Sequence, residues 1–219
     1  MRKIKCFVLG DDTVGKSSLL VTFCSGWFPK DYIPYSINNY YKNLLYNQDP
    51  VKLEIFDTNG DDIYDEIRRT TCTNVDVFII CFSLADRNSL SRVESKWIQE
   101  IRNSHQNVPY VLVGLKKDLQ NNEQAVSTAQ GEEVKSRISA YSYVECSSSN
   151  HDNVDLVFKT VLDSILEPES EPEPQPQLQP AQPQQPPSPV PEQKVPQESK
   201  SRSNRSENRR TKKFKCDLL

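Results

Sequence analysis

Residues 10–17, which read GDDTVGKS, constrain the fold more than any other part of the sequence. They fit the pattern Gly-x4-Gly-Lys-Ser, and they stand between the apolar run 4–9 and the apolar residues 19–21. A glycine-containing turn between a strand and a helix lets backbone N–H groups surround phosphate oxygens at the helix N-terminus. The motif therefore predicts a phosphate-binding loop at a strand-to-helix junction.

The side chains of this loop have distinct expected roles. Lys16 offers a positive charge to the outer phosphates of a nucleotide, and Ser17 offers a hydroxyl to a magnesium ion. The residues expected to contact nucleotide in this segment are Asp12, Thr13, Val14, Gly15, Lys16, Ser17 and Ser18.

Apolar runs alternate with amphipathic segments along the chain, which is typical of a mostly parallel sheet with helices on both faces. Strands are expected at 4–9, 40–46, 51–56, 75–83, 110–113 and 141–146, and helices at 17–25, 89–104, 125–138 and 154–166. The almost wholly apolar segment 75–83 is predicted to lie in the middle of the sheet. The expected fold is a three-layer α/β fold of the P-loop NTPase type, with a six-stranded, mostly parallel sheet and about five helices.

The composition of the chain changes abruptly at about Pro168, beyond which most of its 15 prolines lie, mixed with Gln, Glu and Ser. Such a segment cannot bury enough apolar surface to offset the entropy of the chain. We therefore expect one domain at 1–166, a disordered Pro/Gln/Glu-rich linker at 167–198 and a basic tail at 199–219.

Hydropathy and cysteine usage predict a soluble, cytosolic protein. No apolar run approaches the ~20 residues that a membrane-spanning helix needs, and the N-terminus lacks the apolar core of a signal peptide. Five of the six cysteines are scattered, mostly in apolar segments and without the paired spacing of a metal site. They are expected to be buried, reduced thiols.

Polar motifs at three expected strand ends indicate which nucleotide is bound. Asp57 can hold the water shell of magnesium, and the N–H of Gly60 can approach the terminal phosphate. Asp118 can accept hydrogen bonds from N1–H and the exocyclic amine of guanine, a pair of donors that adenine lacks. Ser147 and Ser148 follow the last strand and are expected to close over the base.

Residues 3–166 resemble the Ras-type small GTPases, and specifically their Rho/Rac branch. The matching runs are Ile4-Lys5-Cys6, Phe28-Pro29, Tyr32-Ile33-Pro34, Asn39-Tyr40, Asp57-Thr58, Asp76-Val77-Phe78, Ile80-Cys81-Phe82-Ser83-Leu84, Lys96-Trp97 and Val111-Leu112-Val113-Gly114.

This resemblance implies a small G-protein that binds GTP or GDP with Mg²⁺. It implies that Phe28 stacks on guanine and that the alkyl stem of Lys116 lies along the base. Residues 28–40 and 58–70 correspond to the two switch regions, through which effector and regulator proteins bind when the terminal phosphate orders them. The residues placed at the reacting phosphate are Lys16, Gly60 and Asp61.

Four departures from the family pattern, at Asp12, Tyr35, Asn59 and Asp61, predict slow GTP hydrolysis. Asp12 stands where the family has Gly, and its carboxylate would crowd the terminal phosphate and any arginine supplied by a partner. Asn59 replaces the usual Ala. Asp61 replaces the Gln that positions the attacking water, and an ionised carboxylate only accepts hydrogen bonds.

Other departures affect magnesium and the base. Tyr35 replaces the switch Thr that binds magnesium, and Ser36 could take that role only if the loop slipped by one residue. Leu115 replaces the Asn or Thr of the guanine motif, which removes one supporting hydrogen bond. About a dozen residues that Rho proteins insert after Asp118 are missing, so the chain is predicted to be a divergent relative of that branch.

Three functions fit these motifs. The first is a cycling GTPase switch, and the second is a GTP-locked or nucleotide-indifferent scaffold of the same fold that recruits partners to a membrane. The third, a phosphate-loop kinase, is disfavoured because the chain has no obvious lid segment and because Asp118 follows the guanine pattern.

The C-terminal segment predicts a lipid anchor. Cys216-Asp217-Leu218-Leu219 fits the Cys-a-a-X prenylation pattern, and a terminal Leu favours geranylgeranyl. The basic run 209–215 would add about 1 kcal/mol per positive charge near an anionic leaflet. The expected location is the cytoplasmic face of membranes, most of all the plasma membrane, with a cytosolic pool.

Parts of the tail also fit two other kinds of partner. A basic run alone is also typical of nuclear-import or RNA-binding arms, but its place directly before Cys216 favours the membrane, and no nucleic-acid partner is expected. The runs 183–186 and 186–189 have the minimal spacing of a Src-homology-3 ligand. They lack a well-placed flanking Arg or Lys, so a plain spacer is the better interpretation.

Overall fold

The computed structural model describes residues 1–29, 39–120 and 125–167, and the statements below concern these residues. The chain divides into two units, Met1–Glu173 and Pro174–Leu219, and all described residues belong to the first. Tyr35, Ser36, most of the predicted linker, the basic tail and Cys216 lie outside the described residues, so the domain boundaries and the predictions made for these residues stay predictions.

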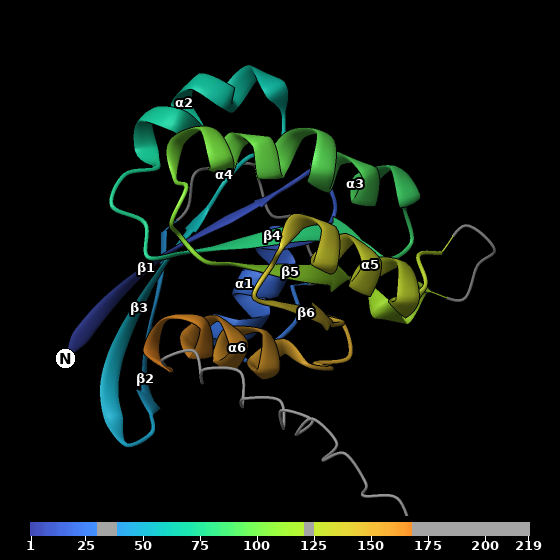
Figure 1. Ribbon diagram of the computed structural model, residues 1–219. Helices are drawn as coiled ribbons and strands as arrows, with labels where there is room; N and C mark the ends of the chain where they lie inside the picture. Colours follow the sequence, from blue (N-terminus) through green and yellow to red (C-terminus); the bar gives the residue numbers. More distant parts are fainter. Residues whose placement is uncertain (30–38, 121–124, 168–219) are drawn as a thin grey trace, which may run out of the picture. The chain divides into compact units, whose positions relative to one another are not determined.

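Six strands form one sheet in the order β2-β3-β1-β4-β5-β6 (Figure 1). The hairpin of β2 and β3 is antiparallel, whereas every other neighbouring pair is parallel. This topology confirms the predicted mostly parallel sheet. The strands are β1 (Arg2–Gly10), β2 (Asn39–Tyr46), β3 (Asp49–Asp57), β4 (Val77–Ser83), β5 (Tyr110–Leu115) and β6 (Ser142–Glu145).

The described helices agree with the expected number of about five. The segments α3, η2 and α4 follow one another without a break, so they form one long helix with a π-helical turn in its middle. The bounds are α1 (Lys16–Ser25), α2 (Asp65–Thr71), α3 (Arg87–Arg92), η2 (Val93–Trp97), α4 (Ile98–Ser104), α5 (Thr128–Ile138) and α6 (Val154–Leu166), with 3₁₀ turns η1 (Asp62–Tyr64) and η3 (Lys117–Leu119).

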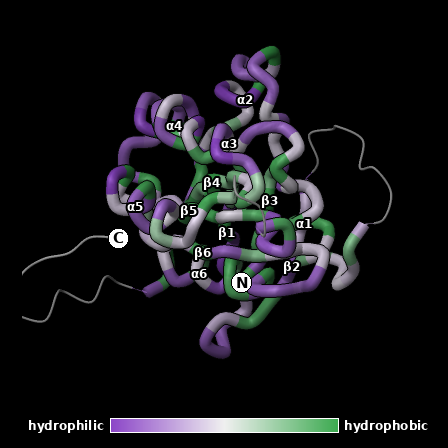
Figure 2. The backbone as a smooth tube through the Cα atoms, turned by 90° about the vertical axis from the view of Figure 1, so that its right-hand side faces the viewer, coloured by the Kyte–Doolittle hydropathy of each residue, from purple (hydrophilic) through white to green (hydrophobic). Residues whose placement is uncertain are grey.

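Two hydrophobic clusters fill the spaces on the two faces of the sheet. Successive side chains of a strand point to opposite faces, so Cys6 and Val8 of β1 pack with α1 and α6, whereas Phe7 and Leu9 pack with the α3–α4 helix and α5. Every residue of β4 is buried, and the apolar tube segments concentrate in the strands at the centre (Figure 2). The three-layer α/β fold is therefore confirmed.

Local chemistry explains where the structure differs from the sequence-based bounds. The helix expected from residue 125 begins at Thr128, because Ser127 and Gln130 form a capping box at its N-terminus. The hairpin turns at Asn47 and Gln48, both with positive φ, so Asp49 already belongs to β3. The short helix α2 was not predicted, since its sequence DEIRRTT carries no apolar stripe.

The five cysteines among the described residues are free thiols. Burial raises the pKa of Cys146 to about 12, so this thiol stays protonated at neutral pH. In the described ranges, none of the helices combines the length and apolarity needed to cross a membrane.

Candidate nucleotide-binding site

The loop between β1 and α1 depends on two glycines. Gly10 and Gly15 have φ angles of +147° and +114°, a region in which L side chains are strained. A Cβ atom on Gly10 would lie 2.3 Å from the carbonyl oxygen of Cys81 in the neighbouring strand β4. The backbone path of the loop therefore requires glycine where the phosphate-binding motif has it.

Lys16 is held across the loop. Its Nζ donates hydrogen bonds to the carbonyl oxygens of Gly10 at 2.9 Å and Asp11 at 2.8 Å. Burial lowers the pKa of Lys16, and the negative charge of Asp57 opposes that shift. The ammonium group is thus fixed at the loop that the motif assigns to phosphate.

Ser17 and Asp57 meet at the end of β3 that faces the loop. Ser17 Oγ donates a hydrogen bond to Asp57 Oδ2 at 2.5 Å, and Asp57 is only 4% exposed. Its other oxygen, Oδ1, is buried and has no hydrogen-bond partner among the described residues. Burial raises the pKa of Asp57, whereas the Ser17 hydrogen bond and the charge of Lys16 lower it.

This pair fits Mg²⁺. A buried, unpartnered carboxylate oxygen is costly, and a cation would satisfy it. Mg²⁺ in phosphate sites takes one or two protein ligands and completes its shell with water and phosphate oxygens. Residues 1–29, 39–120 and 125–167 contain no cluster of three or more His, Cys, Asp or Glu side chains that could hold a metal. When bound, the ion would neutralise charge on the phosphates.

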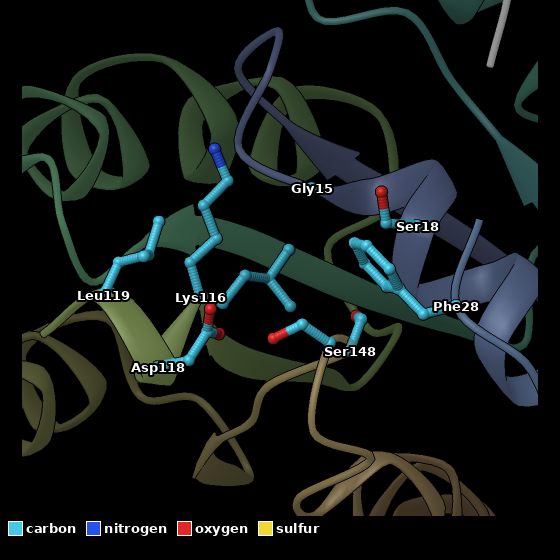
Figure 3. Close-up of a pocket in the computed structure, with 9 residues that line it drawn as sticks. Gly15, Ser18, Phe28, Lys116, Asp118, Leu119 and Ser148 are labelled. Atoms are coloured by element: carbon cyan, nitrogen blue, oxygen red, sulfur yellow. The ribbon is translucent and has the colours of Figure 1, made fainter. Parts of the chain in front are cut away.

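A pocket of about 180 Å³ opens beside the loop. Phe28 lies on one side of it, and Lys116, Asp118 and Leu119 lie on the other (Figure 3). The lining residues are Gly15, Ser18, Phe28, Leu115, Lys116, Asp118, Leu119, Ser148 and Ser149. An aromatic ring facing a lysine stem and a carboxylate can hold a flat base that presents hydrogen-bond donors.

Asp118 is oriented and kept ionised by the loop after β6. Ser147 Oγ donates a hydrogen bond to Asp118 Oδ1 at 2.5 Å, and it also lies 3.0 Å from Ser149 Oγ. Burial alone would raise the pKa of Asp118, but hydrogen bonds from Ser147 and Ser149 outweigh it and lower the pKa. The carboxylate is therefore an acceptor at neutral pH, as recognition of guanine requires.

Lys116 links the base pocket to the phosphate loop. Its Nζ donates a hydrogen bond to the carbonyl oxygen of Thr13 at 2.6 Å, so the alkyl stem spans from one element to the other. Leu115, where the sequence pattern expected a polar residue, is 1% exposed and belongs to the core beneath α1 and α6.

The segment after β3 closes against the phosphate loop. The N–H of Gly60 donates a hydrogen bond to Asp12 Oδ1 at 2.9 Å. Asn59 Oδ1 accepts from the N–H of Asp61 at 3.0 Å, and Asp61 Oδ1 accepts from the N–H of Ile63 at 3.2 Å. The carboxylate of Asp61 therefore caps η1, a role that its assignment beside the terminal phosphate did not anticipate.

The α3–α4 helix supports both segments. Arg92 Nε and Trp97 Nε1 donate hydrogen bonds to Asp11 Oδ1 at 2.9 Å and 2.8 Å. Lys96 Nζ donates to the carbonyl oxygen of Gly60 at 3.3 Å and forms an ion pair with Asp62. The π-helical turn η2 contains Lys96 and Trp97, and such turns are frequent at functional sites.

The structure brings most of the predicted residues together at the phosphate loop and the pocket beside it. Six predicted residues line the pocket, and Ser147 stands behind Asp118. Sequence reasoning missed Leu119 and Ser149 as lining residues, although Ser149 extends the Ser147-Ser148 run that was singled out. The six that line the pocket are Gly15, Ser18, Phe28, Lys116, Asp118 and Ser148.

Comparison with protein families gives a match over most of the chain. The model of the Ras family matches residues 5–167, a stretch that contains the phosphate loop, the Ser17–Asp57 pair and the pocket around Asp118. Proteins of this family are small GTP-binding signalling proteins that bind GTP or GDP, typically with Mg²⁺, and interact with regulators and effectors. The chain belongs to the Ras family.

Proposed function

We propose that this protein is a membrane-anchored, Rho-like small GTP-binding protein that acts as a guanine-nucleotide-dependent signalling switch with weak GTP hydrolysis. The observation that carries the choice of guanine is the ionised Asp118, which lines a pocket opposite Phe28 and accepts a hydrogen bond from Ser147. Guanine offers this carboxylate two donors, whereas adenine leaves it unpaired, which discriminates strongly.

The residues around the phosphates have separable roles in this proposal. Lys16 and the loop N–H groups bind phosphate oxygens, and Ser17 with Asp57 holds Mg²⁺. Asp61 accepts but cannot donate, so it orients a water poorly beside phosphate oxygens, and Asp12 adds a second negative charge. Catalysis of phosphoryl transfer depends on positioning and charge stabilisation, and both are weakened here.

The Rho-like assignment and the anchor rest on sequence. The runs that resemble the Rho/Rac branch include parts of the first switch region, 28–40. We propose that effectors and regulators bind through this region and through the second switch region, 58–70. We propose that Cys216 carries a geranylgeranyl group and that the basic run 209–215 supplies the second membrane signal, since one lipid chain alone holds a protein weakly. The proposed location is the cytoplasmic face of the plasma membrane, with a cytosolic pool.

Exchange of Asp118 for Asn tests the choice of base. The amide of Asp118→Asn can donate to the 2-keto oxygen of xanthine but faces the 2-amino group of guanine with a donor. We expect the affinity for GDP to fall at least about 100-fold, the combined effect of two charge-assisted hydrogen bonds, and the affinity for xanthosine diphosphate to rise.

Asp152→Asn is the matched control, because the Asp152 side chain pairs with Lys117 and does not line the pocket. Binding of GDP by this control should change less than about threefold. Equal binding of GDP and ADP by the unaltered protein would contradict the proposed function.

A GTP-locked or nucleotide-indifferent scaffold is the alternative function. The departures at Asp12, Asn59 and Asp61 support this scaffold as much as they support a switch with weak hydrolysis. The nucleotide that stays bound to freshly purified protein distinguishes the switch from the two kinds of scaffold. Mostly GDP indicates a cycling switch, mostly GTP a locked scaffold, and no nucleotide a scaffold that does not depend on it.

A further inference from the structure

The contact between Asp12 and Gly60 joins the phosphate loop to the segment after β3. Asp12 Oδ1 accepts the hydrogen bond from the N–H of Gly60 at 2.9 Å across 48 residues of sequence. This N–H is the group that the sequence assigns to the terminal phosphate. A carboxylate oxygen of the protein therefore accepts the hydrogen bond that the sequence assigns to an oxygen of the terminal phosphate.

Gly60 is also held at its carbonyl oxygen and lies close against the phosphate loop. Its carbonyl oxygen accepts from Lys96 Nζ at 3.3 Å. A Cβ atom added to it would lie 2.4 Å from the carbonyl oxygen of Gly10 and 2.5 Å from the backbone nitrogen of Asp12. Only a glycine can lie this close to the loop, and hydrogen bonds at its N–H and its carbonyl oxygen hold the segment in this position.

We propose that Asp12 is a specificity-determining residue that makes the protein prefer a guanosine diphosphate to a triphosphate, by acting as an internal substitute for the terminal phosphate. A diphosphate places nothing between the loop and Gly60, so the Asp12–Gly60 hydrogen bond persists when it binds. A triphosphate must displace the carboxylate from Gly60 and then tolerate its negative charge nearby.

The neighbouring carboxylate provides an internal comparison. Asp11 adds the same charge to the same loop, but its Oδ1 is held by Arg92 and Trp97 on the α3–α4 helix. A general effect of negative charge in the loop would therefore arise from both residues, whereas an effect of the Gly60 contact arises from Asp12 alone.

The proposal rests on the proposed guanine-nucleotide binding and is tested by affinities for GDP and for a non-hydrolysable GTP analogue, measured by competition with fluorescent GDP in the presence of Mg²⁺. We expect the full-length protein to bind GDP at least about tenfold more tightly than the analogue. Asp12→Ala should shift this ratio toward the analogue at least about tenfold, which is the effect of one charge-assisted hydrogen bond. Asp12→Asn, which keeps an acceptor oxygen but loses the charge, should give an intermediate ratio.

Two further variants distinguish an effect of the Asp12–Gly60 hydrogen bond from a general effect of negative charge in the loop. Asp155→Asn removes one charge from the exposed surface of α6 and should leave the ratio within about threefold of the starting value. Asp11→Asn removes one charge from the loop but keeps an oxygen that can accept from Arg92 and Trp97, and it should change the ratio less than Asp12→Asn does. A ratio that moves equally in Asp11→Asn and Asp12→Asn overturns the contact, and so does a shift below about twofold in Asp12→Ala.

Hydrogen exchange supplies a readout that does not depend on affinity. The amide of Gly60 should exchange slowly in the GDP-bound protein and at least about tenfold faster in Asp12→Ala, while the amides of β4 remain unchanged. Equal exchange in both proteins overturns the proposal. Failure of the unaltered protein to bind either nucleotide would overturn the proposed function as well, whereas equal affinities for both would overturn only the role of Asp12.

Discussion

Trp97 Nε1 donates a hydrogen bond to Asp11 Oδ1 at 2.8 Å, across 86 residues of sequence. The indole is fully buried, and Arg92 donates to the same oxygen. The helix on one face of the sheet thereby holds the first turn of the phosphate loop. Because hydrogen bonds to an ionised group are among the stronger ones, this contact fixes the loop before any nucleotide binds.

Replacement of Trp97 by Phe removes the donor while keeping an aromatic side chain. We expect Trp97→Phe to lower the free energy of unfolding by about 2–4 kcal/mol, from the lost charge-assisted hydrogen bond and the smaller ring. Urea denaturation measures this change. The matched control, Trp27→Phe, alters a side chain that is 57% exposed and should stay within about 0.5 kcal/mol. Equal stability of the two variants would contradict the role assigned to Trp97.

Arg68 is a buried side chain that holds the segment after β3 through hydrogen bonds. It is 3% exposed, it donates to the carbonyl oxygens of Asn59 at 2.6 Å and Asp61 at 3.0 Å, and it pairs with Glu100. Removing it leaves these partners unsatisfied, so Arg68→Ala should cost about 3–5 kcal/mol of stability.

Thermal or urea unfolding measures the effect of Arg68→Ala. Its neighbour Arg69 is exposed, so Arg69→Ala, which removes the same charge, should cost less than about 0.5 kcal/mol. A loss of similar size in both variants would show that net charge, and not the buried contacts, sets the stability.

Slow hydrolysis is predicted to arise from Asp12 and Asp61 together. Asp61→Gln restores a side chain that can both donate to and accept from water, and Asp12→Gly removes the neighbouring charge. We expect the double variant to hydrolyse bound GTP at least about tenfold faster than the unaltered protein in single-turnover measurements. Asp155→Asn serves as the control. Equal rates in the unaltered protein and the double variant would show that Asp12 and Asp61 do not slow hydrolysis.

The proposed lipid anchor predicts that membrane association depends on the thiol of Cys216. In cells, Cys216→Ser should move the protein from the membrane fraction to the cytosol, because the basic run 209–215 alone binds reversibly and weakly. Fractionation or fluorescence imaging measures the shift, and Cys72→Ser, which alters a half-buried thiol of the folded domain, is the control. Unchanged membrane association of Cys216→Ser would rule out the anchor.

Local sequence patterns were sufficient for the fold class and for the parts of the site that lie at strand ends. The alternation of apolar and amphipathic segments along the chain and the almost wholly apolar segment that forms β4 predicted the layered sheet, because hydrophobic patterning reflects which faces are buried. Lys16 could be singled out from the phosphate-loop motif, and Asp57 and Asp118 because the carboxyl ends of parallel strands meet at one edge of a sheet. The short helix α2 escaped prediction because polar residues without an apolar stripe leave no periodic signal.

The sequence by itself determined a phosphate loop, a candidate guanine-selecting carboxylate and a basic C-terminal segment, because each depends on residues that are close together along the chain. Only the tertiary structure decided which donors Asp11 and Asp12 meet. Asp11 reaches Trp97 and Asp12 reaches Gly60 because the middle of the α3–α4 helix and the end of β3 lie beside the loop. Such pairings across 86 and 48 residues depend on how the layers pack, which no local pattern encodes.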